Sequence, residues 1–167
     1  GTLQMCFMIA NAVAQLGFGH VADRWRPRAL VILGPLVAVS MLSLVGLASS
    51  PWMLGAILIV GGLGAAAFHP PAAALVHQLG QARKGFAMSF YITGGSLGFA
   101  LGPLLFAPFA ERYGLRWTPV LMVPGLALLA FMLPRVPPIE SLGNHGDRSG
   151  FRALLPYRKP LTLLYLI

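Results

Sequence analysis

Long uncharged runs of apolar residues alternate with short charged segments along this chain of 167 residues. No Asp, Glu, Lys or Arg occurs from Ala29 to Ala82. As a single helix this run would extend over ~80 Å at ~1.5 Å per residue, whereas the hydrocarbon core of a bilayer is ~30 Å thick. The run must therefore fold back on itself, and Ser49, Ser50 and Pro51 mark the turn. The pattern predicts an all-α, polytopic membrane helix bundle.

The charged segments divide the chain into five complete predicted spans and the start of a sixth. The five predicted spans are 1–22, 29–47, 52–79, 85–110 and 117–133. Together they make one transmembrane bundle over residues 1–134. Prolines, glycines and mixed charge predict a long solvated loop at 135–157, and residues 158–167 are expected to start the next span.

The distribution of cations predicts the orientation of the bundle, because Lys and Arg are retained on the cytoplasmic side of a membrane. The loops that follow the first, third and fifth spans hold ten of the twelve cations, whereas the alternate loops hold only Arg112 and Arg116. We therefore expect the loops at 23–28, 80–84 and 135–157 to be cytoplasmic.

The composition excludes several other classes of protein. Hydrophobic residues make up 57% of the chain and charged residues only 10%, whereas about a quarter of a soluble domain is charged. The net charge of +8 does not indicate nucleic-acid binding, because the cations lie at the ends of apolar runs rather than on a soluble face. The single Cys6 excludes an intrachain disulfide, and no Cys and His cluster or carboxylate pair suggests a metal or cofactor.

The first charged turn resembles the signature loop between the second and third helices of the major facilitator superfamily. The matching residues are Gly19, Asp23, Arg24 and Arg28. Arg26 and Pro27 stand where the family usually has Gly and Arg. The resemblance implies a cytoplasmic gate in which these residues favour the outward-open state. The alternative is an ordinary cationic loop whose single acid is incidental.

A second stretch resembles the fosmidomycin resistance branch of the same superfamily. It carries Phe68-His69-Pro70 in the third span and a Gly-Gly stretch leading to Leu-Gly-Pro-Leu at 101–104 in the fourth. The branch commonly has Glu after Phe-His-Pro, but this chain has Pro71. A carboxylate that could carry a proton is therefore missing at this position.

His69 is the one titratable residue deep in a span, and such groups are costly and usually functional. Because imidazole changes charge near neutral pH, His69 is a candidate to handle a proton or a substrate. The alternative is a neutral histidine bonded to a carbonyl freed by Pro70 or Pro71. These two prolines are also expected to kink the helix beside His69.

Small and polar residues at a spacing of four mark further helix faces. Gly94, Gly98 and Gly102, followed by Pro103, predict close helix packing. Two polar pairs could line a cavity or join helices by hydrogen bonds. These pairs are Asn11 with Gln15 and Ser89 with Thr93.

Two enzyme patterns occur by chance in our interpretation. Gly94 to Gly98 fits a nucleophile elbow around Ser96, with His69 as the one candidate partner, but that motif needs a strand and a sharp turn. Glycines at 62 and 64 imitate a dinucleotide fingerprint without a βαβ unit. We expect no enzyme activity.

The resemblances imply a secondary active transporter that exports a small molecule or drug in exchange for protons by alternating access. The chain would correspond to helices two to seven of a twelve-helix protein in a bacterial inner membrane, surrounded by lipid. The first helix and the C-terminal half are then expected in the remainder of the same polypeptide. The alternative is a facilitator or uptake carrier of the same superfamily without proton antiport.

Overall fold

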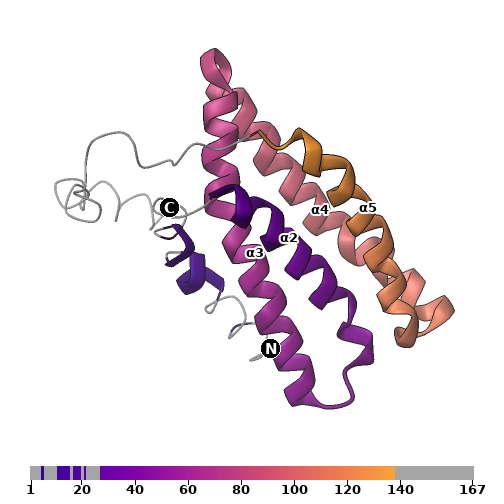
Figure 1. The fold of residues 1–167 in the computed structure, drawn as a ribbon. Helices are drawn as coiled ribbons and strands as arrows, with labels where there is room; N and C mark the ends of the chain where they lie inside the picture. Colours follow the sequence, from indigo (N-terminus) through magenta and orange to yellow (C-terminus); the bar gives the residue numbers. More distant parts are fainter. Residues whose placement is uncertain (1–4, 6–10, 16, 20, 22–26, 138–167) are drawn as a thin grey trace.

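The computed structural model describes residues 5, 11–15, 17–19, 21 and 27–137, and every element in them is helical. Four long helical segments run up and down beside one another (Figure 1). The α-helices are α2 (Pro27–Ser43), α3 (Pro51–Leu79), α4 (Lys84–Tyr113) and α5 (Met122–Met132). Short 3-10 segments lie at their ends: η1 (Val45–Leu47), η2 (Gln81–Arg83), η3 (Leu115–Leu121) and η4 (Leu133–Arg135).

Four of these segments are long and apolar enough to cross a membrane. They are Pro27–Leu47, Pro51–Leu79, Gln81–Tyr113 and Leu115–Arg135. Their bounds lie within a few residues of the second to fifth predicted spans. The chain is therefore an all-α, multi-pass membrane helix bundle. Three parts of the chain lie outside the described residues. They are most of the predicted first span, the segment 22–26 that follows it, and all residues from 138 onward.

The up-and-down course gathers the helix ends into two groups. The start of α2, the turn between α3 and α4, and the end of α5 lie toward one end of the bundle in Figure 1, and the other turns lie toward the opposite end. The first group carries Arg28, Arg83, Lys84 and Arg135, and the second carries Arg112 and Arg116. The described residues thus keep the cation asymmetry on which the predicted orientation depends.

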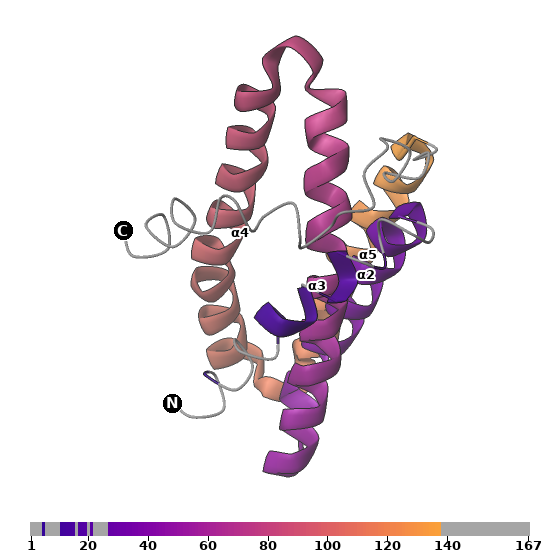
Figure 2. The same ribbon diagram turned by 90° about the vertical axis from the view of Figure 1, so that its left-hand side faces the viewer.

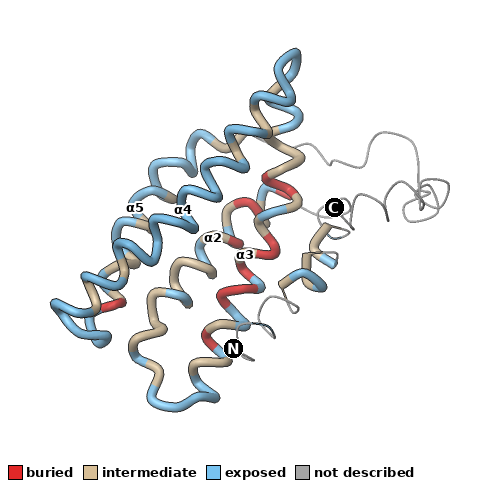
Figure 3. Tube along the Cα trace, turned by 180° about the vertical axis from the view of Figure 1, so that it is seen from behind, coloured by how far each residue is buried: buried red, intermediate tan, exposed pale blue. Residues whose placement is uncertain are grey.

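The most extensive helix packing is between α2 and α3, where two glycines meet. A Cβ atom added to Gly34 would lie 2.7 Å from the carbonyl oxygen of Gly64, and one added to Gly64 would lie 2.7 Å from the carbonyl oxygen of Gly34. The backbones therefore touch without side chains between them, as small residues allow in membranes. Most of the buried residues lie along α3 next to this crossing (Figure 3).

The turn between α2 and α3 confirms the position predicted from Ser50 and Pro51. The Ser50 hydroxyl accepts a hydrogen bond from the backbone N–H of Met53 at 3.2 Å, which caps the first turn of α3. Pro51 occupies the first helical turn, where its missing N–H costs nothing.

The fifth span differs from the prediction of one regular helix from residue 117. Residues Leu115–Leu121 form a 3-10 segment before α5 begins. Pro119 lies inside this segment and cannot donate to a helical ladder. The neighbouring Thr118 is fully buried, and its hydroxyl accepts a hydrogen bond from the backbone N–H of Gly46 at 3.1 Å. This bond ties the start of the fifth span to the end of the second.

Replacing Thr118 with Val is expected to lower the free energy of unfolding by about 1–3 kcal/mol, because the N–H of Gly46 would lose its acceptor. Thr118→Ser keeps the hydroxyl and should cost clearly less. The measurement is thermal unfolding of the full-length protein in detergent. Equal melting temperatures for the valine variant and the wild type would show that this bond contributes nothing.

Candidate functional site

Two cavities meet at a shared wall formed by His69 of α3 and Tyr91 of α4. The larger cavity, of about 1300 Å³, is bounded by α3, α4 and α5. The smaller one, of about 450 Å³, is lined by Gln15 of the N-terminal helical residues and by α3 and α4. Both His69 and Tyr91 line both cavities. The predicted candidate His69 therefore lies at the one place where the two described cavities share side chains.

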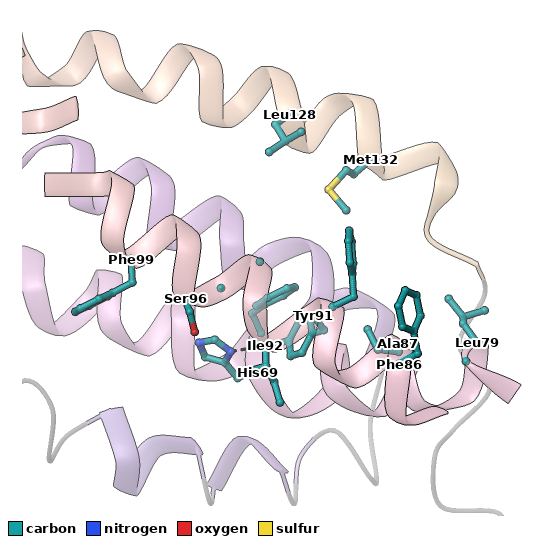
Figure 4. Close-up of a pocket in the computed structure, with 16 residues that line it drawn as sticks. His69, Leu79, Phe86, Ala87, Tyr91, Ile92, Ser96, Phe99, Leu128 and Met132 are labelled. Atoms are coloured by element: carbon teal, nitrogen blue, oxygen red, sulfur yellow. Dashed lines mark hydrogen bonds between the residues drawn. The ribbon is translucent and has the colours of Figure 1, made fainter. Parts of the chain in front are cut away.

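His69 and Tyr91 are joined by a hydrogen bond between the imidazole Nδ1 and the phenol Oη at 3.3 Å (Figure 4). The aromatic ring of Phe68 lies beside the imidazole, with the ring centroids 5.7 Å apart. Tyr91 was not among the residues predicted from the sequence. The feature that could have identified Tyr91 is its position on the next span. It follows His69 by 22 residues across a short turn, so both residues lie at a similar depth.

The predicted polar pair Asn11 and Gln15 lies against α3 near this wall (Figure 2). The Gln15 amide donates a hydrogen bond to the Asn11 side-chain oxygen at 2.8 Å. The Asn11 amide in turn donates to the carbonyl oxygen of Gly62 at 3.4 Å. Asn11 thus joins two helical segments, while Gln15 lines the smaller cavity together with His69.

The larger cavity is apolar and rich in aromatic rings. Its polar side chains are His69, Tyr91 and Ser96. Its aromatic walls are Phe68, Phe86, Phe90 and Phe99, and α5 adds Leu128 and Met132 (Figure 4). Within the described residues no hydrogen bond links Ser96 to His69, so the geometry offers no support for a catalytic pair.

Helix α3 continues through Pro70 and Pro71 without interruption from Pro51 to Leu79. Pro71 is buried, and the missing N–H groups leave the carbonyls one turn earlier without their usual helical donors. A bend at these prolines stays a prediction.

No described residue packs against the face of α4 that carries Gly94, Gly98 and Gly102. A Cβ atom added to Gly94, Gly98 or Gly102 would meet no described atom within 4 Å, and Gly94 lines the larger cavity. Pro103 lies inside α4, which continues to Tyr113. Close packing of this face stays a prediction, because no described residue supplies the partner.

Ser89 and Thr93 are exposed and line neither of these two cavities. At ~100° per residue they lie roughly opposite Tyr91 around the axis of α4. Their predicted role at a polar cavity is therefore not met at the His69 and Tyr91 wall. The spacing within the pair is evident from the sequence, whereas the side of α4 that faces α3 is not.

The predicted gate residues are only partly described. Asp23 and Arg24 lie outside the described residues, and Arg28 is exposed in the first turn of α2. A Cβ atom added to Gly19 would lie 4.0 Å from the Cβ atom of Pro70, which is an ordinary contact. The part of the chain that the structure covers therefore does not require glycine at position 19.

The family model described as Major Facilitator Superfamily matches residues 1–167, which is the whole chain. The chain belongs to the major facilitator superfamily. Membership of this superfamily of membrane transporters decides against the enzyme alternative. Among the described residues, no group of three His, Cys, Asp or Glu side chains could hold a metal ion.

Several curated members of the major facilitator superfamily are similar to this chain. The fosmidomycin resistance protein of Escherichia coli (strain K12) is 31% identical over 117 residues, which cover 68% of this chain and 28% of that protein. The multidrug resistance protein MdtG of Serratia proteamaculans (strain 568) is 36% identical over 126 residues, 74% of this chain and 30% of that protein. The uncharacterized MFS-type transporter YfnC of Bacillus subtilis (strain 168) is 30% identical over 156 residues, 90% of this chain and 37% of that protein.

The chain spans about a third of the length of these curated relatives. No solved structure matches it.

Proposed function

We propose that this chain is part of a secondary active transporter that exports a small molecule in exchange for protons by alternating access. The observation that carries the proposal is the position of His69 at the wall shared by the larger, apolar cavity and the smaller cavity that Gln15 also lines. Two of the relatives are named for fosmidomycin resistance and multidrug resistance, which supports export of a small molecule.

The surroundings of His69 favour a functional role over a structural one. A structural histidine would bond to a carbonyl freed by the prolines beside it. The hydrogen bond described for His69 goes instead to the hydroxyl of Tyr91, and its side chain is exposed to the cavities. A group that remains open to a cavity can exchange a proton as the cavity opens to either side of the membrane.

The other parts of the proposal are a gate, a location and a set of partners. Asp23, Arg24 and Arg28 bias a cytoplasmic gate, and the loops at 23–28, 80–84 and 135–157 lie in the cytoplasm of a bacterial cell. The glycine face at Gly94, Gly98 and Gly102 packs against a helix from the remainder of the polypeptide. Similarity to the fosmidomycin resistance branch supports the same placement within the superfamily.

One observation favours a second candidate, a facilitator or uptake carrier without proton antiport. Pro71 stands where the fosmidomycin resistance branch commonly has Glu, so a carboxylate that could carry the proton is missing. In this alternative, His69 would bind the substrate without exchanging a proton.

Transport in vesicles separates the two candidates. The full-length protein is reconstituted in liposomes, with a substrate chosen from a drug-susceptibility panel on a deletion strain. An imposed pH gradient is expected to drive the substrate against its own gradient, and reversal of the pH gradient is expected to reverse the net movement. Equilibration of the substrate that ignores the pH gradient would refute proton exchange and support the facilitator.

A further inference from the structure

Building on the proposed proton exchange, we infer that the site takes an uncharged aromatic molecule that donates a hydrogen bond, such as a phenol. Its ring occupies the larger cavity, and its donor group binds the Nε2 atom of His69. The hydrogen bond between Nδ1 and the Tyr91 hydroxyl is compatible with the tautomer that makes this possible. Two properties of the described residues lead to this class, the cavity lining and the charges, together with the proton exchange proposed above.

The lining of the larger cavity favours a ligand with an apolar, aromatic ring system. Its volume of about 1300 Å³ exceeds that of most small-molecule sites, which measure ~300–1,000 Å³. Phe86, Phe90 and Phe99 of α4 line it, as do Leu128 and Met132 of α5. Aromatic side chains favour stacked or edge-to-face contacts with a ligand ring. The few polar groups gather at the wall shared with the smaller cavity.

The described residues in and near the two cavities supply no counter-ion for a cationic ligand. No Asp or Glu occurs between Asp23 and Glu111, so α2, α3 and most of α4 offer no carboxylate. A permanent cation would lose its hydration without gaining a counter-ion, which is costly in a low-dielectric site. An aromatic amine that stays charged at neutral pH is thus a poor ligand.

The sign of the proton coupling then separates a hydrogen-bond donor from an acid. In exchange, the proton and the substrate must compete for the site. A neutral imidazole whose Nδ1–H donates to the Tyr91 oxygen leaves Nε2 as an acceptor. A phenol donates to Nε2, and protonation of Nε2 removes that acceptor. A carboxylate would instead bind the protonated imidazole, so that acid and proton would move together rather than in exchange.

The groups around His69 leave its imidazole as the group at which proton and substrate compete. Tyr91 faces it from α4, and Gln15, which carries no charge, faces it from the N-terminal helical residues. Across the larger cavity, α5 contributes only Leu128 and Met132. His77 lies eight residues further along α3 and lines neither cavity, so it serves as a matched control.

Four naphthalene probes test the inference on the full-length protein in detergent. 2-Naphthol is a neutral donor, 2-methoxynaphthalene lacks the donor, 2-naphthoate is an acid and 2-naphthyltrimethylammonium is a cation. Calorimetry gives the affinity, and a pH indicator in weak buffer gives the protons exchanged. We expect 2-naphthol to bind about tenfold more tightly than the methoxy compound, because the latter leaves Nε2 unpaired. We also expect its binding to release protons, because it favours the unprotonated imidazole.

Several outcomes would overturn the inference. Tighter binding of 2-naphthoate with proton uptake would assign an acid as the ligand. Equal binding of the naphthol and methoxy compounds would show that the hydrogen-bond donor does not contribute to the affinity. Equal or tighter binding of the ammonium compound would show that a cation is accepted.

Variants at the two histidines test whether the proton release comes from His69. His69→Gln keeps a hydrogen-bond acceptor that does not titrate, so 2-naphthol should still bind while the proton release disappears. His77→Gln should retain both. Proton release that persists in the His69 variant refutes the assignment. If the His69 variant does not fold, Tyr91→Phe serves as the second test, with several-fold weaker binding of 2-naphthol expected and unchanged affinity counting against the tautomer argument.

The outcomes distinguish this inference from the proposed function. If a pH gradient drives export of some other substrate while 2-naphthol does not bind, only the inferred class of substrate falls. If 2-naphthol binds with proton release but no substrate follows the pH gradient, the transport proposal falls and the binding site stands.

Discussion

Replacing His69 with Gln is expected to lower proton-driven export by the full-length protein strongly while leaving downhill exchange of the substrate intact. Glutamine can still bind the substrate by a hydrogen bond, but it carries no proton between the two sides of the membrane. The loss should be about 5- to 150-fold, which is the range of a typical coupling free energy between two ligands. The measurement is substrate accumulation in liposomes with and without an imposed pH gradient.

The matched control is His77→Gln, because His77 is on the same helix but lines neither of the two cavities. It is expected to transport as the wild type does. Tyr91→Phe should weaken substrate binding and keep proton coupling, since the imidazole remains. Undiminished accumulation by the His69 variant under a pH gradient would contradict the role given to this residue.

Replacing Gly64 with Ala is expected to destabilise the bundle by about 1–3 kcal/mol or more, as overpacking of a well-packed contact does. The added methyl group would lie 2.7 Å from both the backbone nitrogen of Ala38 and the carbonyl oxygen of Gly34. These are backbone atoms, so α2 and α3 must move apart to admit it. Thermal unfolding of the full-length protein in detergent measures the effect.

The control for this variant is Gly55→Ala on the same helix, where the added methyl group meets no described atom within 4 Å. That change should leave the stability unaltered or raise it slightly, because alanine favours a helix by ~1 kcal/mol over glycine. Similar melting temperatures for the two variants would show that the glycine crossing does not hold α2 against α3.

The helices from α2 to α4 lie close to the corresponding predicted spans because lipid imposes a simple requirement on each of them. A helix must stay uncharged over the thickness of the bilayer, so the charge-free runs and the turn at Ser50 and Pro51 gave bounds within a few residues of α2, α3 and α4. The 3-10 start of the fifth span was not predictable in this way. It depends on Thr118 and Gly46, which are distant in sequence and meet only in the folded chain.

The candidate site was predictable in part. His69 stood out because a titratable group is rare in an apolar run, whereas Tyr91 did not, because its importance comes from its position opposite His69. The same limit applies to the glycines. Spacing alone favoured the face at Gly94, Gly98 and Gly102, but the close crossing in this chain is between Gly34 and Gly64. Which of several small-residue faces meets a neighbour depends on helix rotation, which an apolar sequence leaves open.

Helix α4 is 30 residues long, yet none of its residues is buried by the part of the chain that the structure describes. Acyl chains solvate such a surface about as well as neighbouring helices do. The separation of α4 from the adjacent helices therefore costs little free energy. Its backbone hydrogen bonds are internal and survive that departure. Detergent extraction of these residues alone would therefore preserve the far-ultraviolet circular dichroism of an intact protein even after the helices had separated, which makes helical content a poor criterion of native assembly.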